Sequence, residues 1–166
     1  MLKRRQKAQL EISFGVIFSI IIIIAVLAIA GYVIVRFLSV DYNVECKLFY
    51  SEMQKKIDES WGSGGSVSYV FSHSVPGKTE KVCFGYTNQS LLSTSDEAAY
   101  DDVALHSDDR SNLFFYPSGA CGDTSFSYQL KHATTDKFFC VSVQNGKANL
   151  KISKDRFDAL VKLNKL

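Results

Sequence analysis

Residues 12–35 form an uninterrupted apolar segment, ISFGVIFSIIIIIAVLAIAGYVIV, between Glu11 and Arg36. Its 24 residues reach about 36 Å as an α-helix, which exceeds the hydrocarbon thickness of about 30 Å in a bilayer. Only two serines and one tyrosine interrupt the apolar character. A core helix in so small a protein would need a polar side facing water. The segment therefore predicts a transmembrane helix near the N-terminus.

A second pattern follows directly and has the three- and four-residue spacing of an amphipathic helix. Its apolar positions are Cys46, Phe49, Tyr50, Met53, Ile57 and Trp61, with charged residues between them. The sequence Gly62-Ser63-Gly64-Gly65 is a strong helix stop. Because no proline interrupts residues 9–61, we expect one helix of about 50 residues, with a bend near Ser39–Asn43.

The rest of the chain has the short alternating segments of a β-rich head. The expected strands are Val67–His73, Glu80–Tyr86, Asn112–Tyr116 and Phe126–Lys131, with Pro76-Gly77 forming the turn between the first two.

The clearest hairpin signal is Asn145-Gly146, which suits a type I′ turn between two alternating strands. Val141, Val143, Leu150 and Ile152 would then share the inner face of the sheet. Ser153 is expected to cap a C-terminal helix with an apolar stripe of Phe157, Leu160 and Val161. The expected class is α+β, an antiparallel sheet of four to six strands with helices packed against it.

A polar insertion at Thr87–Ser111 separates two of these strands. Thr94 and Glu97 fit a capping box, which predicts a short helix at Ser95–Leu105. The acidic residues of the insertion occur in pairs, Asp96/Glu97, Asp101/Asp102 and Asp108/Asp109. We interpret these pairs as solvated surface rather than a calcium site, because an alternating acidic loop with a central glycine is missing. Asn88-Gln89-Ser90 is an N-glycosylation sequon, and Asn88 is its acceptor.

Charge and cysteine content indicate the orientation. The net charge of +2 is too small to indicate nucleic-acid binding, and its basic excess is local, at Lys3, Arg4, Arg5 and Lys7. Basic residues beside a membrane helix remain in the cytoplasm, so residues from about 40 onward should lie outside. The roughly 120 residues after the apolar helix suffice for one compact domain.

All four cysteines, Cys46, Cys83, Cys121 and Cys140, lie on that exported side. Two disulfides are expected there, and four cysteines allow three pairings. Metal binding is the alternative, but no Cys-x-x-Cys pair is present and His73, His106 and His132 are scattered singly. We expect no cofactor and no metal. Phosphate-loop, zinc-protease and nucleophile-elbow motifs are also missing from the sequence, which argues against an enzyme.

The N-terminal segment KRRQKAQLEISFG, a basic head followed by Lys7-Ala8-Gln9 and then the apolar helix, resembles the class III signal peptides of archaeal type IV pilins and archaellins. The resemblance covers about 30 residues. It implies that a prepilin peptidase cuts between Ala8 and Gln9 and leaves the helix on the mature chain. It further implies homo-oligomeric assembly through that helix into a surface filament or pseudopilus. More loosely, the chain also resembles uncharacterised archaeal single-pass membrane proteins, which implies no activity.

One departure concerns the acidic residue. Many pilins carry a glutamate at the fifth mature position, whereas this chain has Glu11 at the third and Ser13 at the fifth. The resemblance implies that Glu11 pairs with the Gln9 α-amine of a neighbouring subunit, and the alternative places Glu11 at the lipid headgroups beside Lys7.

The expected organisation is a basic leader at 1–8, a transmembrane helix at 9–39, an amphipathic helix at 40–62 and an exported head at 63–166. Two alternatives to cleavage after Ala8 remain open. The first is cleavage as an ordinary signal peptide, although such a peptide has a shorter apolar core than this one. The main alternative to a pilin-like subunit is an uncut single-pass protein whose extracytoplasmic head binds a partner.

Overall fold

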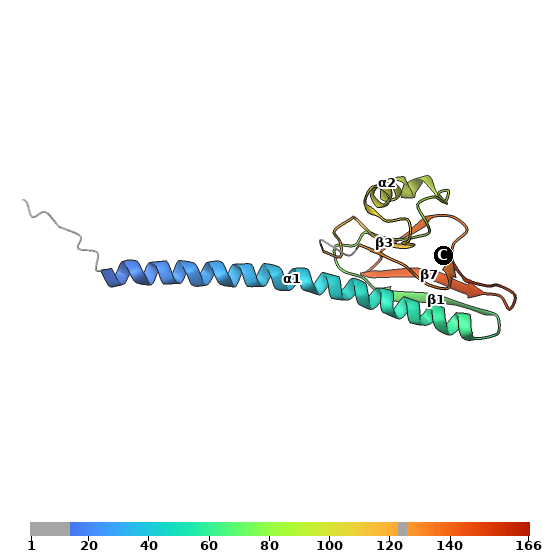
Figure 1. Cartoon of the computed structure of the whole chain (residues 1–166), viewed down its shortest axis with the longest axis horizontal. Coiled ribbons are helices and arrows are strands. Elements are labelled where there is room, and N and C mark those ends of the chain that lie inside the picture. The colour runs from blue at the N-terminus through green and yellow to red at the C-terminus, as the bar shows by residue number, and fades with distance from the viewer. Residues whose placement is uncertain (1–13, 123–125) are drawn as a thin grey trace, which may run out of the picture. The chain divides into compact units, whose positions relative to one another are not determined.

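The computed structural model describes residues 14–122 and 126–166 (Figure 1). The elements in chain order are α1 Phe14–Gly62, β1 Val67–Ser74, β2 Lys81–Phe84, η1 Thr94–Asp96, α2 Glu97–His106, β3 Leu113–Tyr116, β4 Ser127–Tyr128, β5 Ala133–Thr134, β6 Phe139–Ser142, β7 Lys147–Lys154 and β8 Val161–Asn164. The chain divides into two compact units, one ending at Leu38 and the other comprising Ser39–Leu166, which we call the head.

Helix α1 confirms the expected long N-terminal helix and ends at Gly62, where the glycine-rich stop was predicted. Gly64 has a positive φ of 63°, a conformation that glycine adopts without steric cost. Within the head, Phe49, Met53 and Ile57 of α1 are completely buried. The amphipathic spacing read from the sequence therefore identifies the side of the helix that packs on the head. The predicted bend near Ser39–Asn43 stays a prediction.

The head contains two four-stranded sheets, whereas a single antiparallel sheet of four to six strands was expected. Sheet A has the strand order β1-β7-β8-β5, and sheet B has the order β4-β3-β2-β6. The expectation of purely antiparallel pairing was also wrong, because β5 and β8 are parallel. The α+β class itself is confirmed.

Strands β1 and β2 are neighbours in sequence but lie in different sheets. A turn with a hydrogen bond of 2.9 Å from Thr79 N–H to Pro76 O separates them, as the Pro76-Gly77 pair predicted. After this turn β1 pairs with β7, while β2 pairs with β3 and β6. The local turn was predictable, but the partner of each strand depends on contacts between segments far apart in sequence.

Alternating burial defines the layers of the head. Sheet B has two buried faces: Val82 and Phe115 belong to the main core, which α1 and the inner face of sheet A also form. Phe114 and Cys83 point to the opposite face, where Ala99 and Val103 of α2 cover them. The order of layers is therefore sheet A, main core, sheet B and α2, with α1 packed on the main core.

The Asn145-Gly146 turn is confirmed, with φ angles of 52° and 71°. Backbone hydrogen bonds join Gln144 and Lys147 across it, at 2.9 and 3.0 Å. The flanking strands nevertheless part after this one bridge, since β6 joins sheet B and β7 joins sheet A. The four predicted inner-face residues, Val141, Val143, Leu150 and Ile152, all pack in or against the main core.

The predicted C-terminal helix is wrong. Ser153 lies within β7, and a turn over residues 155–160 leads into strand β8. Asp155 and Asp158 close this turn with backbone and side-chain hydrogen bonds of 3.0 Å each. Phe157 is 95% exposed, so the residues of the supposed apolar stripe do not share a buried side.

The helical part of the polar insertion is confirmed as η1 and α2, but its capping differs from the prediction. The hydroxyl of Ser93 caps η1 by accepting from Ser95 N–H at 3.3 Å, so Thr94 is not the N-cap residue. Asn112–Tyr116 is confirmed as β3, whereas the strand expected at Phe126–Lys131 is reduced to the two residues of β4.

Candidate functional site

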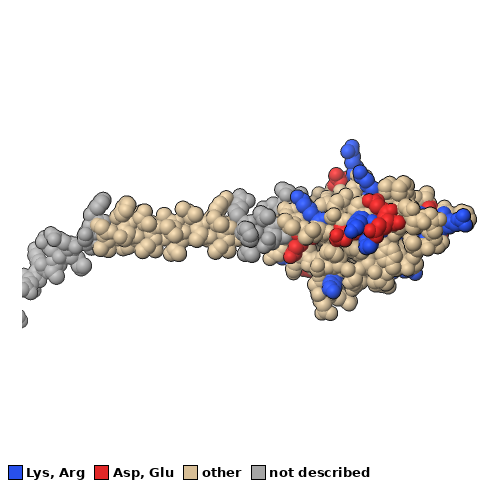
Figure 2. Space-filling view, turned by 90° about the horizontal axis from the view of Figure 1, so that it is seen from below, with Lys and Arg blue, Asp and Glu red and all other residues tan. Residues whose placement is uncertain are grey.

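The first candidate site is the apolar part of α1. Gly15–Val35 is long and apolar enough to cross a membrane, with a mean hydropathy of 3.0, and none of it is buried within the chain. Figure 2 shows this stretch as a helix surface without charged residues. Ser19 donates its hydroxyl to Gly15 O at 2.8 Å, which satisfies that polar group inside the helix. Such a surface is stable only against lipid or other apolar helices.

The residues predicted for processing and assembly, Ala8, Gln9 and Glu11, lie outside the described residues. So do the four basic residues that set the predicted orientation.

The second feature is the disulfide framework, which the structure settles among the three pairings left open. Cys46 of α1 bonds to Cys121 in the segment after β3. Cys83 of β2 bonds to Cys140 of β6, directly opposite it in the ladder. The first bond lies within the head and ties α1 to the segment after β3, and the second ties two neighbouring strands of sheet B. Sequence spacing contains no signal for this choice, because pairing follows from the three-dimensional arrangement.

A row of polar contacts also fixes α1 to the segment before β5. Gln54 forms two hydrogen bonds with the backbone of Lys131, accepting at 2.8 Å and donating at 3.2 Å. His132 lies 3.0 Å from Asp58 and stacks on Trp61 with ring centroids 3.9 Å apart. The indole N–H of Trp61 donates to Ala159 O at 3.0 Å. The histidine expected to stand alone, His132, is thus part of the contact between α1 and the segment before β5.

Asp96 is a buried charge of the head, whereas the sequence pattern predicted a place for it on the solvated surface. Its carboxylate is 2% exposed and accepts from Cys140 N–H at 3.1 Å. The ammonium groups of Lys81 and Lys165 lie 3.2 and 3.3 Å from it. Burial by itself raises the pKa of Asp96, but these three donors outweigh it and hold the pKa below its ordinary value.

This network joins η1, β2, β6 and the C-terminal residues around one carboxylate.

A second acid of the insertion, Asp102, also has a side-chain partner that the sequence did not reveal. Its carboxylate accepts from both the N–H and the hydroxyl of Ser118, at 2.8 and 3.0 Å. His106 lies 3.3 Å from the same carboxylate. Because the Ser118 hydroxyl is directed to Asp102 rather than to His106, the three do not form a nucleophile–base relay.

Within residues 14–122 and 126–166, histidines, cysteines and acids do not gather into a group of three that would suit a metal ion. His73 lies at the margin of the core, where its ring stacks on Phe71 and meets Phe49 edge to face. Asn88 of the sequon is exposed in a loop, where a glycan would be accessible.

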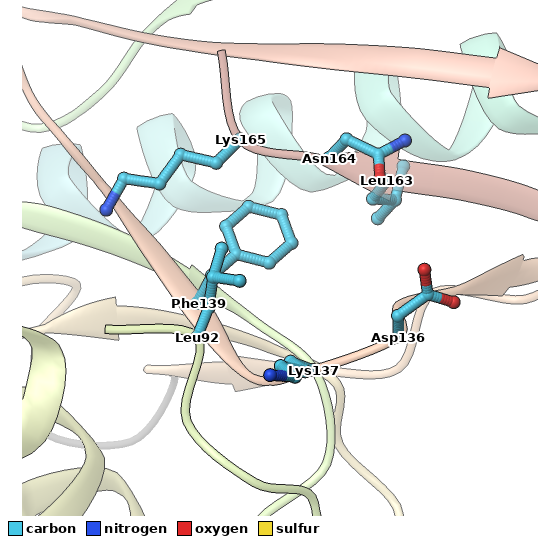
Figure 3. A pocket seen from close by; sticks show the side chains of 7 residues that line it. All are labelled: Leu92, Asp136, Lys137, Phe139, Leu163, Asn164 and Lys165. Atoms are coloured by element: carbon cyan, nitrogen blue, oxygen red, sulfur yellow. The ribbon is translucent and has the colours of Figure 1, made fainter. Parts of the chain in front are cut away.

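A small cavity lies beside the C-terminal strand (Figure 3). Its lining residues are Leu92, Asp136, Lys137, Phe139, Leu163, Asn164 and Lys165, and its volume is about 210 Å³. Phe139 and Leu163 belong to the main core, and the charged groups of Asp136 and Lys165 stand on opposite sides of the Phe139 ring (Figure 3). The cavity is smaller than the roughly 300 Å³ at which ligand pockets begin, so it is a weak candidate for a small-molecule site.

No protein-family model, curated protein or solved structure matches this chain. Its class therefore follows from its own architecture. The chain combines an N-terminal apolar helix with a disulfide-bonded α+β head, an organisation consistent with a pilin-like protein or an anchored extracellular protein.

Proposed function

We propose that this protein is a type IV pilin-like surface subunit, cut between Ala8 and Gln9, that assembles through its N-terminal hydrophobic helix. The observation that carries the proposal is the contrast along α1. Gly15–Val35 is unburied, whereas Phe49, Met53 and Ile57 of the same helix form part of the head core. One helix thus supplies an apolar surface for assembly and a docked base for an exported domain.

The proposed mechanism begins with insertion of the uncut chain, with the head outside and the basic leader inside. A prepilin peptidase then removes residues 1–8. The apolar helix leaves the bilayer by exchanging lipid contacts for contacts with neighbouring helices, so its apolar surface stays out of water throughout. Glu11 would neutralise the new Gln9 α-amine of an adjacent subunit, which lowers the cost of moving both charges into a helix bundle.

The alternative function is an uncut membrane-anchored protein whose head binds a partner outside the cell. The observation that favours it is the position of the acidic residue, because Glu11 would be third and Ser13 fifth in a chain that begins at Gln9. Both proposals place the disulfide-bonded head outside and differ in processing and assembly.

The test is the intact mass and N-terminal sequence of the protein from its native cells, in the membrane fraction and in material sheared from the surface. A pilin-like subunit begins at Gln9 and is found in sheared, high-mass material. The variant Ala8→Leu, which places a bulky residue at the junction, should retain Met1 and stay with the membrane. A wild-type chain that begins at Met1 and is confined to the membrane would contradict the proposal and support the anchored alternative.

A further inference from the structure

The outer face of sheet A carries lysines and small side chains and is not covered by the head. We call it the lysine face, comprising Ser68, Val70, Ser72 and Ser74 of β1 with Lys147, Asn149, Lys151 and Ser153 of β7. These residues alternate with buried ones such as Phe71, Leu150 and Ile152, so they share the side of the sheet that faces away from the core. Acidic residues are absent from both strands.

The two lysines of this face have no ion-pair partner within the described part of the chain. Lys147 and Lys151 make no salt bridge there, whereas Lys162 and Lys165 of the neighbouring C-terminal segment pair with Asp158 and Asp96. In the ladder, Val70 lies opposite Lys151 and Ser74 lies opposite Lys147. Val70 is 56% exposed. The lysine face is therefore a positive surface with an exposed apolar side chain directly beside Lys151.

Helix α2 presents a surface of the opposite kind. Its outward side places Glu97, Asp101 and Leu105 at four-residue spacing, and Asp108 and Asp109 follow the helix end. We call these five residues the acidic surface. Leu105 is 79% exposed, and the four acids around it are exposed as well. Ala99 and Val103 occupy the buried side of the same helix.

The lysine face and the acidic surface lie at opposite ends of the layered head. Sheet A, the main core, sheet B and α2 follow one another in that order, because Val82 and Phe115 face the core shared with sheet A while Phe114 faces α2. A single chain therefore cannot bring the two surfaces together. A second copy can, with Leu105 meeting Val70 and the acids meeting Lys147 and Lys151.

We propose that the lysine face of one head binds the acidic surface of the next copy of this chain. The contact is heterologous, since each copy uses two different surfaces, and contacts of this kind extend into open filaments when the rotation between copies does not close a ring. Opposite charges set the register, and the apolar pair lies beside the contact that Lys151 makes. The inference rests on the proposed filament and adds the contact between heads to the contact between helices.

The test is charge reversal in the full-length protein, expressed in its native cells and measured as the yield of sheared filaments. Lys147→Glu with Lys151→Glu, and separately Asp101→Lys with Asp109→Lys, should each lower the yield on the order of tenfold by opposing like charges. Co-expression of the two variants should restore the yield, because each reversed surface then meets a reversed partner. The matched control is Lys47→Glu with Lys55→Glu, the same charge change on exposed residues of α1.

Non-reducing mass measurements confirm in each variant that both disulfides have formed. Wild-type yield from either charge-reversed variant would overturn the contact and leave the pilin-like function standing. Loss of filaments in both variants without restoration on co-expression would also overturn it, since the lysine face would then serve another partner. Failure of the pilin-like function itself is recognised differently, by a wild-type chain that begins at Met1 and never enters sheared material.

Discussion

Asp96 illustrates at the scale of one residue how burial and pairing decide the role of a charge. A carboxylate that is 2% exposed is stable as an anion only because a backbone N–H and two ammonium groups surround it. In sequence it is one of six acids in a polar insertion, beside Glu97, which is exposed. The local sequence does not distinguish Asp96 from Glu97, because the lysines that pair with Asp96, Lys81 and Lys165, are distant in the chain.

We expect Asp96→Asn to lower the free energy of unfolding at pH 7 by about 2 kcal/mol, because it leaves Lys81 and Lys165 without their shared anion. The loss of stability stays small because both lysines are partly exposed to water, which screens their charges. The measurement is chemical denaturation of the disulfide-intact protein. Asp101→Asn is the control, since Asp101 is exposed and should change stability by less than about 0.5 kcal/mol.

The effect of Asp96 should also depend on pH. Because its folded-state pKa is lowered, its contribution is complete above the unfolded pKa of about 4. The contribution is lost as the pH falls through the lower folded-state pKa. The stability difference between wild type and D96N should therefore be constant near neutral pH and shrink in acid. A difference that grows on acidification would contradict the assignment of Asp96 as a paired anion.

At the scale of elements, patterns that depend on neighbours in sequence were predictive. The apolar and amphipathic parts of α1, its stop at Gly62, strands β1 and β3, the short helix α2 and the Asn145-Gly146 turn were all anticipated, because each depends on local periodicity or backbone preference. The split into two sheets and the disulfide pairing were not, because both depend on which distant segments meet.

The C-terminal segment shows where local periodicity is ambiguous. Phe157, Leu160 and Val161 have helical spacing, yet Val161 and Leu163 alternate with Lys162 and Asn164 as a strand does. The segment becomes a strand because β8 pairs with β7 on one side and with β5 on the other. The segment 157–164 is too short for either pattern to decide the structure by itself.

Two truncations should distinguish the strand from the helix. Leu163→Ala should lower the free energy of unfolding by about 3 kcal/mol, because Leu163 is buried in the main core of the head. Phe157→Ala should change it by less than about 0.5 kcal/mol, because that ring is 95% exposed. A C-terminal helix with the predicted stripe would give the reverse order. Thermal or chemical denaturation of both variants measures the difference, and a larger loss for Phe157→Ala would contradict β8.

At the scale of the whole molecule, two independent features predict the same orientation. The basic residues before the apolar helix predict a cytoplasmic N-terminus. Two disulfides within the head are typical of an oxidising compartment. Neither depends on cleavage after Ala8, so we expect the same orientation for the filament subunit and for the anchored protein.

We therefore expect a membrane-impermeant maleimide to label Phe157→Cys on intact cells and to label Lys3→Cys in an Ala8→Leu background only after lysis. Labelling reports only on the introduced cysteine in each variant, because all four natural cysteines are bonded in disulfides and do not react with the maleimide. Phe157 suits the purpose because it is 95% exposed on the head. The Ala8→Leu change keeps residue 3 on the chain if a prepilin peptidase acts. Labelling of Lys3→Cys, but not of Phe157→Cys, on intact cells would show that the topology is the reverse of the one expected. It would place the head with its disulfides in the cytoplasm, where neither proposed function can operate.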